Sequence, residues 1–548
     1  MLKPFQSDGT FHPIATGTGL RRTAVRGAGA AILGSAGNFA LQIGSIGILA
    51  RLLFPSDFGI VTMVTTFSLL LRSFGLAGFT EFIMQYEDLT DALASNLFWI
   101  NLGIGTILTI AFASSGRLLA HFFHNSGVID VTYGMSLTIV IGCLGYVHTG
   151  LLQRAMHYKT TAIISFVGQI VQYIVSIGLA FAGWHQWALV WGSVAQTVVL
   201  AAGAWLVCRW IPSWPRRASG TRSGLRFGIT VYLRFAFNYL TRNTDNVLVG
   251  WRFGDRAIGF YKRAFDLFIL PETQLLAPLS AVVVNTLSRV RRDREQFQRY
   301  FLRTISVLAL IGMGIGADLA LIGSDFIRFL FGSGWDEAGR IFALFGPGIG
   351  VMLLYNTHGW IHLSIGRPER WFRWGLLEFV CTASLFLLTL RWGPSGIAFA
   401  WTGSYFLLMF PGFWYAGRPI GLGIGPVIGV IWKFFVASAG AGVATLVIFR
   451  AMPYFATMFG LRGAFVRMVF VSLVFFALYL SGVIALHRGI KPLSETAGLL
   501  RDLLPERMVG RASAAFDAMP SQAILGYSGD AKLQPDLMTV PDGSGAKV

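Results

Sequence analysis

Two stretches of the sequence place charged side chains inside long apolar runs, where an unpaired charge is costly. The first holds Arg234, Asn238, Arg242 and Asp245, which on a helix fall within an arc of about 80°. A charge near the bilayer centre costs about 2.5–3.5 kcal/mol on insertion scales, so such groups usually face a partner or a water-filled cavity. We expect this stripe to line a cavity. An ion-paired structural stripe, or snorkelling by Asp245, is the alternative.

The second stretch holds Lys262, Arg263, Asp266, Pro271 and Glu272. Lys262 and Asp266 are four residues apart on a helix and can neutralise each other, which leaves Arg263 as the uncompensated cation. Pro271 removes a backbone hydrogen bond and bends its helix, as the helices that gate transporters often do. This stretch therefore predicts a kinked helix that carries charges of both signs.

The predicted chemistry is the recognition of an anion. Arg offers a planar fork that matches phosphate oxygens, and Lys offers a point charge. We therefore predict a substrate-binding set of five cations: Arg72, Arg234, Arg242, Lys262 and Arg263. Three carboxylates are the candidates for coupling to H⁺ or Na⁺, a coupling that the sequence does not require: Asp245, Asp266 and Glu272.

Other patterns that could do chemistry are weaker. His358 and His362 have a metal-compatible spacing on a helix, but no third ligand is evident, so metal binding is not expected. The three cysteines lie within or at the ends of apolar runs, without the spacing of a metal site or a disulfide framework. No Gly-x-x-x-x-Gly-Lys loop occurs, so ATP-driven transport is not expected. We predict no cofactor, no metal and no catalytic residue.

The elements that must position these residues follow from composition. Apolar residues make up 54% of the 548 residues and charged residues only 13%, against about 25% in soluble proteins. That balance excludes a disordered chain, a disulfide scaffold and a cytosolic enzyme, and it indicates one polytopic membrane domain. The net charge of +18 is explained by Lys and Arg in cytoplasmic loops, so no nucleic-acid partner is expected.

Fourteen apolar runs are long enough to cross a bilayer as helices, because a span needs about 20 residues and an open sheet edge cannot lie in lipid. Their approximate ranges are 27–50, 58–80, 93–115, 129–152, 161–182, 187–207, 227–250, 258–286, 304–323, 340–363, 374–391, 396–416, 428–449 and 465–487. Their many glycines are expected to allow close approach of helices. The predicted fold is an all-α polytopic membrane protein.

Orientation follows from Lys and Arg, which are roughly twice as frequent on one set of connections as on the other. We therefore place both termini in the cytoplasm. The longest connection is rich in Pro and Arg and divides the chain. The predicted parts are a cytoplasmic segment (1–26), a six-helix bundle (27–207), a cytoplasmic linker (208–226), a second six-helix bundle (227–416), two additional helices (417–487) and a partly disordered cytoplasmic tail (488–548).

An internal repeat relates the two bundles, because residues 48–59 resemble residues 247–259. The corresponding pairs are Leu49 with Leu248, Phe54 with Phe253, and Gly59 with Gly259. Both copies run in the same direction, which indicates a pseudo-twofold axis along the membrane normal; transporters built this way bind substrate between their halves. Arg72 then corresponds roughly to Glu272. Chance similarity of two short loops is the alternative.

Several segments resemble the polysaccharide flippases of the Wzx/PST type, within the MOP exporter superfamily. They include Ala50–Gly59 (ARLLFPSDFG), Phe74–Leu76 with Gln85, Asn96–Asn101 (NLFWIN), Leu152–Met156, Asp245–Gly250 (DNVLVG), Gly259–Ala264 (GFYKRA), Leu270-Pro271 and Leu287–Arg289. Their order and spacing carry the resemblance, which covers the first seven to eight helices. The remaining helices match mainly by hydropathy.

This resemblance implies two helical bundles around a central cavity and alternating access. It also implies export of a lipid-linked (polyprenyl-diphosphate) oligosaccharide across the bacterial inner membrane, for surface polysaccharide biosynthesis. The partners would be that glycolipid, the lipid bilayer, and polysaccharide polymerase or assembly proteins. The resemblance does not specify the sugar.

Two other functions fit part of the pattern. A cation-coupled multidrug exporter of the same superfamily would favour acidic cavity residues over this set of Arg and Lys. A membrane polymerase or glycosyltransferase would usually need a large external loop or paired acidic residues at a helix end, and neither is evident. We therefore expect a transporter rather than an enzyme.

Overall fold

The computed structural model of the protein describes residues 2–6, 8–11, 39–216, 220–452, 460–494, 496 and 498. Within these ranges the chain forms helices, with three isolated β-bridges and no named strand. The expected all-α fold is therefore confirmed for the described part. The N-terminal segment and the tail that the sequence predicts lie largely outside it.

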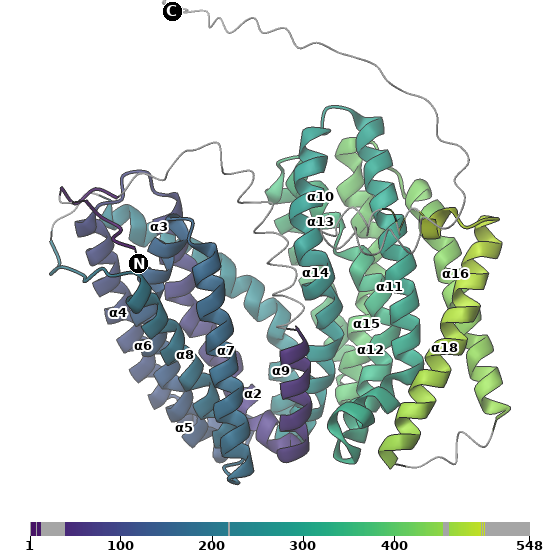
Figure 1. Cartoon of the computed structure of the whole chain (residues 1–548), viewed down its shortest axis with the longest axis horizontal. Coiled ribbons are helices and arrows are strands. Elements are labelled where there is room, and N and C mark those ends of the chain that lie inside the picture. The colour runs from purple at the N-terminus through teal and green to yellow at the C-terminus, as the bar shows by residue number, and fades with distance from the viewer. Residues whose placement is uncertain are drawn as a thin grey trace, which may run out of the picture. The chain divides into compact units, whose positions relative to one another are not determined.

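The N-terminal half is a group of helices, most of which stand on the left of Figure 1. It contains a helix at Phe39–Leu52, α2 (Pro55–Ser73), the π-helix η1 (Phe74–Phe79), α3 (Thr80–Gln85), α4 (Asp91–Ser114), α5 (Gly116–Phe123), α6 (Gly127–Arg154), α7 (Tyr158–Phe181) and α8 (Gln186–Val207). Helices α4 and α6 pack together, and so do α6 with α8 and α7 with α8. Residue Thr90 begins α4 by accepting a hydrogen bond from the backbone of Leu93 at 3.2 Å, as an N-cap does.

The C-terminal half begins with α9 (Thr221–Pro271), which is broken at Gly254. Gly254 has φ 81° and ψ −174°, a conformation that a residue with a side chain rarely adopts, so α9 is two helices joined by an elbow. The remaining elements are the π-helix η2 (Glu272–Leu276), α10 (Ala277–Arg289), α11 (Arg294–Phe331), η3 (Ser333–Trp335), α12 (Asp336–Tyr355), α13 (His358–Ser364), α14 (Pro368–Thr389), η4 (Leu390–Trp392), α15 (Gly393–Gly417), η5 (Arg418–Ile420), α16 (Ile424–Arg450) and α18 (Gly460–His487).

Ten segments of the described chain are helices long and apolar enough to cross a membrane. They match the second to sixth and ninth to fourteenth predicted spans, with α14 and α15 counted as one segment. The seventh and eighth predicted spans correspond to α9, η2 and α10, which are not among the ten; α9 and the start of η2 carry the charged stretches. The first predicted span lies only partly within the described residues, where it is the shorter apolar helix Phe39–Leu52. The count of fourteen therefore stays a prediction.

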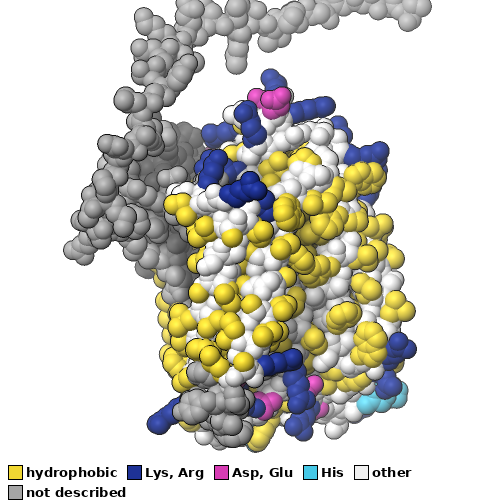
Figure 2. All heavy atoms as spheres, turned by 90° about the vertical axis from the view of Figure 1, so that its right-hand side faces the viewer, with side chains coloured by type: hydrophobic (Ala, Val, Ile, Leu, Met, Phe, Trp, Pro, Cys, Tyr) yellow, Lys and Arg dark blue, Asp and Glu magenta, His cyan; other side chains and the backbone are white. Residues whose placement is uncertain are grey.

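The surface agrees with burial in a bilayer. Figure 2 shows hydrophobic side chains over the middle of one face and Lys and Arg side chains gathered toward its two ends. A soluble monomer rarely exposes an apolar surface of this extent, because it would associate or aggregate in water. The chain is therefore a multi-pass membrane protein.

Small residues allow the closest helix pair of the C-terminal half. Helices α11 and α12 cross where Gly312 and Gly316 face Gly346 and Gly350, two pairs with the same four-residue spacing. A Cβ on Gly350 would lie 2.7 Å from the carbonyl oxygen of Gly312, and one on Gly346 would lie 2.5 Å from the Cα of Ala320. In lipid, such backbone contact is the main source of helix association, because lipid is as apolar as the side chains.

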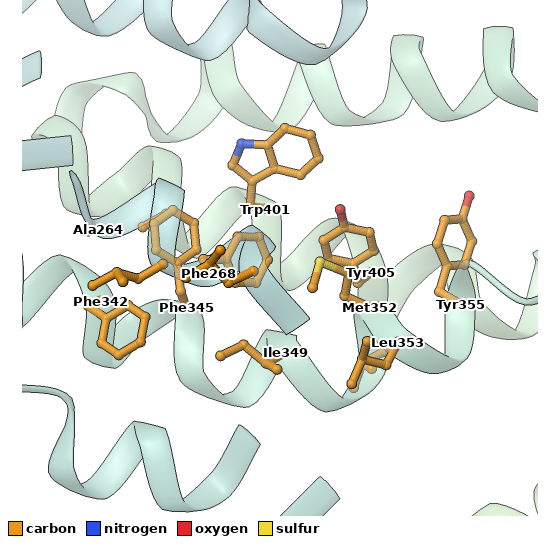
Figure 3. Close-up of a cluster of buried hydrophobic side chains, with 14 of the residues drawn as sticks. Ala264, Phe268, Phe342, Phe345, Ile349, Met352, Leu353, Tyr355, Trp401 and Tyr405 are labelled. Carbon is orange, nitrogen blue, oxygen red and sulfur yellow. The ribbon is translucent and has the colours of Figure 1, made fainter. Parts of the chain in front are cut away.

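Aromatic side chains fill the space beside this crossing. In Figure 3, Phe268 of α9 lies against Phe345 of α12, and Trp401 and Tyr405 of α15 close the cluster from the other side. The rings of Phe268 and Phe345 stack with centroids 4.4 Å apart. Stacked and edge-on pairs of this kind stabilise a core by about 0.5–1.5 kcal/mol each beyond burial. The second half of α9 is thereby fixed to α12 and α15.

Helices α16 and α18 pack against each other and against α11 (Figure 1). Two polar contacts fasten α18 to α11. Arg467 donates to Asp325, with Nε 3.0 Å from Oδ2, and the hydroxyl of Ser472 donates to Oδ2 of Asp318 at 3.1 Å. A partly buried ion pair specifies which helix face meets its partner, since leaving either charge buried without the other is costly.

Candidate substrate passage

A pocket lies within the N-terminal half and contains Arg72. Its volume is about 400 Å³, and α2, η1, α6, α7 and α8 line it. The polar lining residues are Arg72, Tyr146, Thr149, Gln153, Tyr158, Thr161, Ser165 and Thr197. None of the described lining residues is acidic. The pocket therefore presents one cation and several hydroxyl, phenol and amide groups within a mainly apolar lining.

The pocket lies toward one end of its bundle. Its lining residues occupy 142–153 of α6, 158–165 of α7 and 197–204 of α8, which is the half of each helix nearest the connection between α6 and α7. Arg154 at that end of α6 donates to the carbonyl oxygens of Ile83 and Tyr86, at 2.7 Å and 2.6 Å. The end of α3 therefore lies at the same end of the bundle, and the start of α2 at Pro55 lies at the opposite end.

Arg72 faces both the pocket and the other half of the chain. It lies two residues before η1, and η1 packs against α9, where the rings of Phe74 and Tyr232 meet edge-on with centres 4.9 Å apart. No ion pair of Arg72 occurs among the described residues. The cationic edge of the pocket is therefore the edge toward α9, and substrate binding by Arg72 stays a prediction.

A charge cluster on the second part of α9 differs from the expected pairing. Lys262 donates to Asp266, with Nζ 2.5 Å from Oδ1, and Arg263 pairs with the same carboxylate, with Nη2 3.0 Å from Oδ2. The expectation that Arg263 is left uncompensated is wrong, because positions three and four residues away on a helix reach one side chain together. The cluster keeps one net positive charge, shared by two cations.

Arg263 also crosses between the two halves. Its guanidinium carbon lies 4.8 Å from the centre of the Phe58 ring in α2, close enough for a cation–π contact. Its side chain is 16% exposed and its Nε has no partner in the described structure. The cluster of Lys262, Arg263 and Asp266 therefore lies where the N-terminal and C-terminal halves meet.

The first part of α9 carries the other predicted cations. Arg242 is 55% exposed, and its Nη1 lies 3.5 Å from Oε1 of Glu272, which follows Pro271. Glu378 of α14 is within electrostatic range of both side chains. Arg234 is exposed, and the described structure contains no ion pair of it. Three residues of the predicted stripe are therefore exposed at the surface of the chain: Arg234, Asn238 and Arg242.

Asp245, at the end of that stripe, is sealed instead. It is fully buried, and its Oδ2 accepts hydrogen bonds from the hydroxyl of Tyr261 at 2.6 Å and from Nε1 of Trp401 at 3.0 Å. Snorkelling of Asp245 into water is therefore wrong. A carboxylate in this position links the two parts of α9 to α15, and its role in ion coupling stays a prediction.

The helix breaks occur at matching places in the two halves. Pro271 ends α9, and the π-helix η2 follows at Glu272; in the other half, the π-helix η1 begins at Phe74, two residues after Arg72. A π-helical segment loosens the regular hydrogen bonding of a helix and is frequent at functional sites. The correspondence of Arg72 with Glu272 therefore places Arg72 two residues before one π-helix and Glu272 at the first position of the other.

Some polar residues of the passage and its supports were not predicted from sequence. Tyr261 and Trp401 are aromatic residues in apolar runs, and nothing in the sequence separates them from the core. Asp318 and Asp325 are different, since both are carboxylates within or just after an apolar span. The rule that intramembrane charges are functional or paired would have identified them.

The two copies of the repeat meet in a reciprocal contact. A Cβ built on Gly59 would lie 1.8 Å from the carbonyl oxygen of Asp255, and one built on Gly259 would lie 1.9 Å from the carbonyl oxygen of Pro55. Gly259 and Asp255 are each 200 positions after Gly59 and Pro55. A twofold axis that relates the two stretches would generate this pattern. Only glycine permits so close an approach of one backbone to another.

Further contacts close the same end of the molecule. Trp335 donates from Nε1 to the carbonyl oxygen of Ala50 at 2.7 Å, and Nη2 of Arg51 donates to that of Phe329 at 2.6 Å. Trp335 also packs edge-on against Phe58, with ring centres 5.5 Å apart. The halves are therefore joined at the end that carries Pro55 and the elbow of α9, opposite the end nearest the pocket.

Comparison with known proteins supplies a family. Residues 48–340 match the family described as "Polysaccharide biosynthesis protein". The chain is 24% identical over 363 residues to the succinoglycan biosynthesis transport protein ExoT of Rhizobium meliloti (strain 1021), which covers 66% of this chain and 73% of that protein. It is 23% identical over 394 residues to the teichuronic acid biosynthesis protein TuaB of Bacillus subtilis (strain 168), covering 69% and 79%.

Solved structures supply the fold. The lipid II flippase MurJ in an inward closed conformation matches with a TM-score of 0.67 and 15% identity, over 83% of this chain and 99% of that chain. An inward-facing multidrug resistance MATE family transporter of the MOP superfamily matches with a TM-score of 0.56 and 14% identity, over 70% and 94%. At these identities the likeness concerns the fold, which is that of polytopic membrane transporters.

Proposed function

The chain belongs to the polysaccharide biosynthesis protein family, and from that membership we propose that it moves a lipid-linked oligosaccharide across the cytoplasmic membrane by alternating access. It is a membrane transporter rather than an enzyme. Relatives named for succinoglycan transport and teichuronic acid biosynthesis support a saccharide precursor as the cargo. Its partners in this proposal are the glycolipid and the bilayer.

The observation that carries the proposal is the acid-free pocket with Arg72 at its edge toward α9. A diphosphate and a hydroxyl-rich glycan cannot cross hydrocarbon bare, because each polar group would lose its hydrogen bonds to water. Arg72 and the cluster of Lys262, Arg263 and Asp266 supply cations from the two halves of the chain. A polar passage between the halves lets the head group cross while the polyprenyl chain stays in lipid.

The two halves contact each other at the end that carries Pro55, and this arrangement fits a stage of the transport cycle in which that end is closed. With both termini in the cytoplasm, as proposed from Lys and Arg, the reciprocal glycine contact lies on the far side and the pocket lies toward the cytoplasm. A head group would enter from the cytoplasmic side and leave when the glycine contact opens. Moving a negative charge outward gains about 2.3 kcal/mol per 100 mV of membrane potential, which favours export of a diphosphate.

A multidrug exporter shares the fold but fits the pocket less well. Cationic drugs need an acidic partner, and the described lining residues include none. Asp266 is engaged by two cations, and Asp245 accepts two side-chain hydrogen bonds. Glu272 faces Arg242, with Glu378 near both. The charge available at the pocket and at the cluster of Lys262, Arg263 and Asp266 is therefore positive, which favours an anionic cargo.

The test is reconstitution in proteoliposomes with undecaprenyl diphosphate that carries one sugar. Transport is measured as the fraction of the sugar that becomes accessible to an external glycosidase. Arg72→Gln and Arg263→Gln should each slow transport about 10- to 100-fold, the value of one charge-assisted hydrogen bond. Lys433→Gln, which removes an isolated cation of α16, should leave it unchanged. Equal transport by all four proteins would refute the assignment of Arg72 and Arg263 to the substrate site. No transport by the unmodified protein would refute the proposed function.

A further inference from the structure

The predicted linker between the two halves is fixed to the N-terminal half where the structure describes it. Residues 208–216 form no helix and no named strand, yet side chains of α4 hold their backbone. The hydroxyl oxygen of Ser95 accepts a hydrogen bond from the amide of Ser213 at 3.0 Å. The side chain of Asn96 makes two bonds with the backbone of Arg216, at 2.6 Å and 3.0 Å. This segment therefore has a defined conformation and is not a loose tether.

The N-terminal residues hold the start of the same segment. The carbonyl oxygen of Leu2 accepts from the amide of Arg209 at 3.1 Å. The ring of Phe5 packs against the indole of Trp210, with ring centres 5.9 Å apart. Nε1 of Trp210 donates to Oδ1 of Asp91 in α4 at 2.6 Å. The N-terminal segment and α4 therefore bury Trp210 from two sides.

This arrangement leaves two large apolar side chains exposed. Trp210 is buried, but Ile211 is 82% exposed and Trp214 is 79% exposed. These are the two highest values for a large hydrophobic residue in the described part of the chain. Both residues lie outside the helices that are long and apolar enough to cross a membrane. Because the backbone around them is fixed, their exposure is a lasting feature of the surface.

The neighbouring side chains indicate which partner fits this surface. Arg209 and Arg216 are exposed, one before and one after the two apolar residues. The indole of Trp214 stacks on that of Trp99, with ring centres 5.6 Å apart and planes 5° apart. Tryptophan is enriched at membrane–water interfaces, where its ring lies at the level of the head groups, and arginine is attracted to anionic lipids. The combination favours a lipid head-group layer.

Exposed apolar residues also continue along the chain from a spanning helix into this segment. Leu206 and Val198 are exposed on α8, which is long and apolar enough to cross a membrane. Leu206 lies in the last turn of α8, five residues before Ile211. The linker therefore begins where the chain leaves a membrane-spanning helix, which is where the head-group layer is expected.

We propose that the linker is an anchor in the adjacent head-group layer, where it inserts Ile211 and Trp214 among the lipids. Arg209 and Arg216 bind the phosphates of anionic lipids. This inference goes beyond the proposed function, because it requires a membrane-spanning chain but no particular cargo.

The anchor has a consequence for α9, the helix that follows the linker. Nδ2 of Asn96 donates to the hydroxyl of Thr221, the first residue of α9, at 3.0 Å. The same asparagine holds the backbone of Arg216. The anchored segment and the start of α9 are therefore fixed to one side chain, so the anchor sets the depth at which α9 begins.

The experiment places a nitrobenzoxadiazole fluorophore at position 211 of the full chain in nanodiscs. Cys381→Ser removes the native cysteine that is partly exposed, whereas Cys143 and Cys208 are buried and react slowly. Ile211→Cys then carries the label. One set of nanodiscs contains phosphatidylcholine alone and the other contains phosphatidylglycerol as well. With phosphatidylglycerol, a lipid spin-labelled near its head group should quench the fluorescence strongly, and iodide in the water should quench it weakly.

Asp88→Cys is the matched control, because Asp88 is an exposed residue of the connection between α3 and α4, at the same end of the same half. Its label should be quenched by iodide and not by the lipid. Arg209→Gln combined with Arg216→Gln should lower the ratio of lipid-quenched to iodide-quenched label at position 211 about 5- to 25-fold, since each cation near an anionic surface contributes about fivefold.

Two results would overturn the proposal. If the label at position 211 behaves like the label at position 88, the surface faces water or a protein partner and not lipid. If quenching by the lipid is the same without phosphatidylglycerol and in the double arginine variant, the segment does not bind anionic lipid.

Discussion

The reciprocal glycine contact predicts that one added methyl group opens the closed end of the protein. In Gly59→Ala the new Cβ would begin 1.8 Å from a backbone oxygen, and in Gly259→Ala 1.9 Å. A Cβ atom essentially never lies closer than 3.0 Å to a non-bonded atom, so the two stretches must separate by more than 1 Å. The obstacle is backbone on both sides, and no side chain can rotate away to relieve it.

The cost of this overpacking falls on the closed state alone. Forcing an extra methyl group into a packed contact costs about 1–3 kcal/mol. Since the open state does not contain the contact, that cost shifts the ratio of open to closed about 5- to 150-fold. From a starting ratio of about 1:99, the open population would rise to between roughly 5% and 60%.

The distance between the two copies of the internal repeat can be measured with spin labels on one exposed residue of each copy. Phe54 and Arg252 are both exposed and lie beside the contact, one in each half. With the three native cysteines replaced, cysteines at these two positions would carry the labels for pulsed electron resonance. A population at longer distance should grow in both glycine variants. In the double variant it should grow by less than the two separate gains combined, because one separation relieves both contacts.

Gly103→Ala is the control, since a Cβ there meets nothing within 4 Å. It should leave the distance distribution as it is in the unmodified protein. An unchanged distribution in both Gly59→Ala and Gly259→Ala, with the proteins folded, would refute the idea that this contact closes the passage. A change in one variant alone would refute its reciprocity.

Two further predictions concern buried polar groups and are measured by thermal unfolding in detergent. Trp401→Phe removes one of the two side-chain donors to buried Asp245 and should cost about 1–3 kcal/mol, the penalty of a less satisfied buried carboxylate; no loss would show that Asp245 does not depend on this bond. Arg467→Ala should lower the free energy of unfolding by about 3 kcal/mol. This is the low end for a broken buried ion pair, because Asp325 is 24% exposed. The double variant with Asp at position 467 and Arg at position 325 should recover part of the loss. If the double variant were no more stable than Arg467→Ala, the ion pair would not be what holds α18 against α11.

The positions of the apolar spans could be predicted because each is fixed by a local property, the length of an apolar run. The predicted spans at 93–115 and 129–152 agree with α4 and α6 to within two residues at each end. The break in α9 could also be expected, because the run is interrupted by the charged turn around Gly254. Such features depend on neighbouring residues and on the solvent alone.

Partners across the fold could not be predicted in the same way. Arg467 lies 142 positions from Asp325, and Trp401 lies 156 positions from Asp245. The helix pattern shows that each charge needs a partner, but the choice of partner depends on which helix faces which. Sequence spacing leaves the partner of Asp266 open even within one helix. It allowed a pair with Lys262 or with Arg263, and in the structure both cations contact the Asp266 carboxylate.

In the proposed function, the symmetric and the asymmetric features of the two halves have different tasks. The elements that repeat are mechanical: the glycine contacts of Gly59 and Gly259, and the π-helices that begin near equivalent positions. The elements that differ are chemical, because Arg72 stands where the other half has Glu272, and the pocket is built from the N-terminal half alone. A shared hinge must serve both halves equally, whereas recognition of one head group needs a site that exists once. Substitutions at the repeated glycines should therefore alter the distribution of states for every cargo, and substitutions in the pocket should alter which cargo is carried.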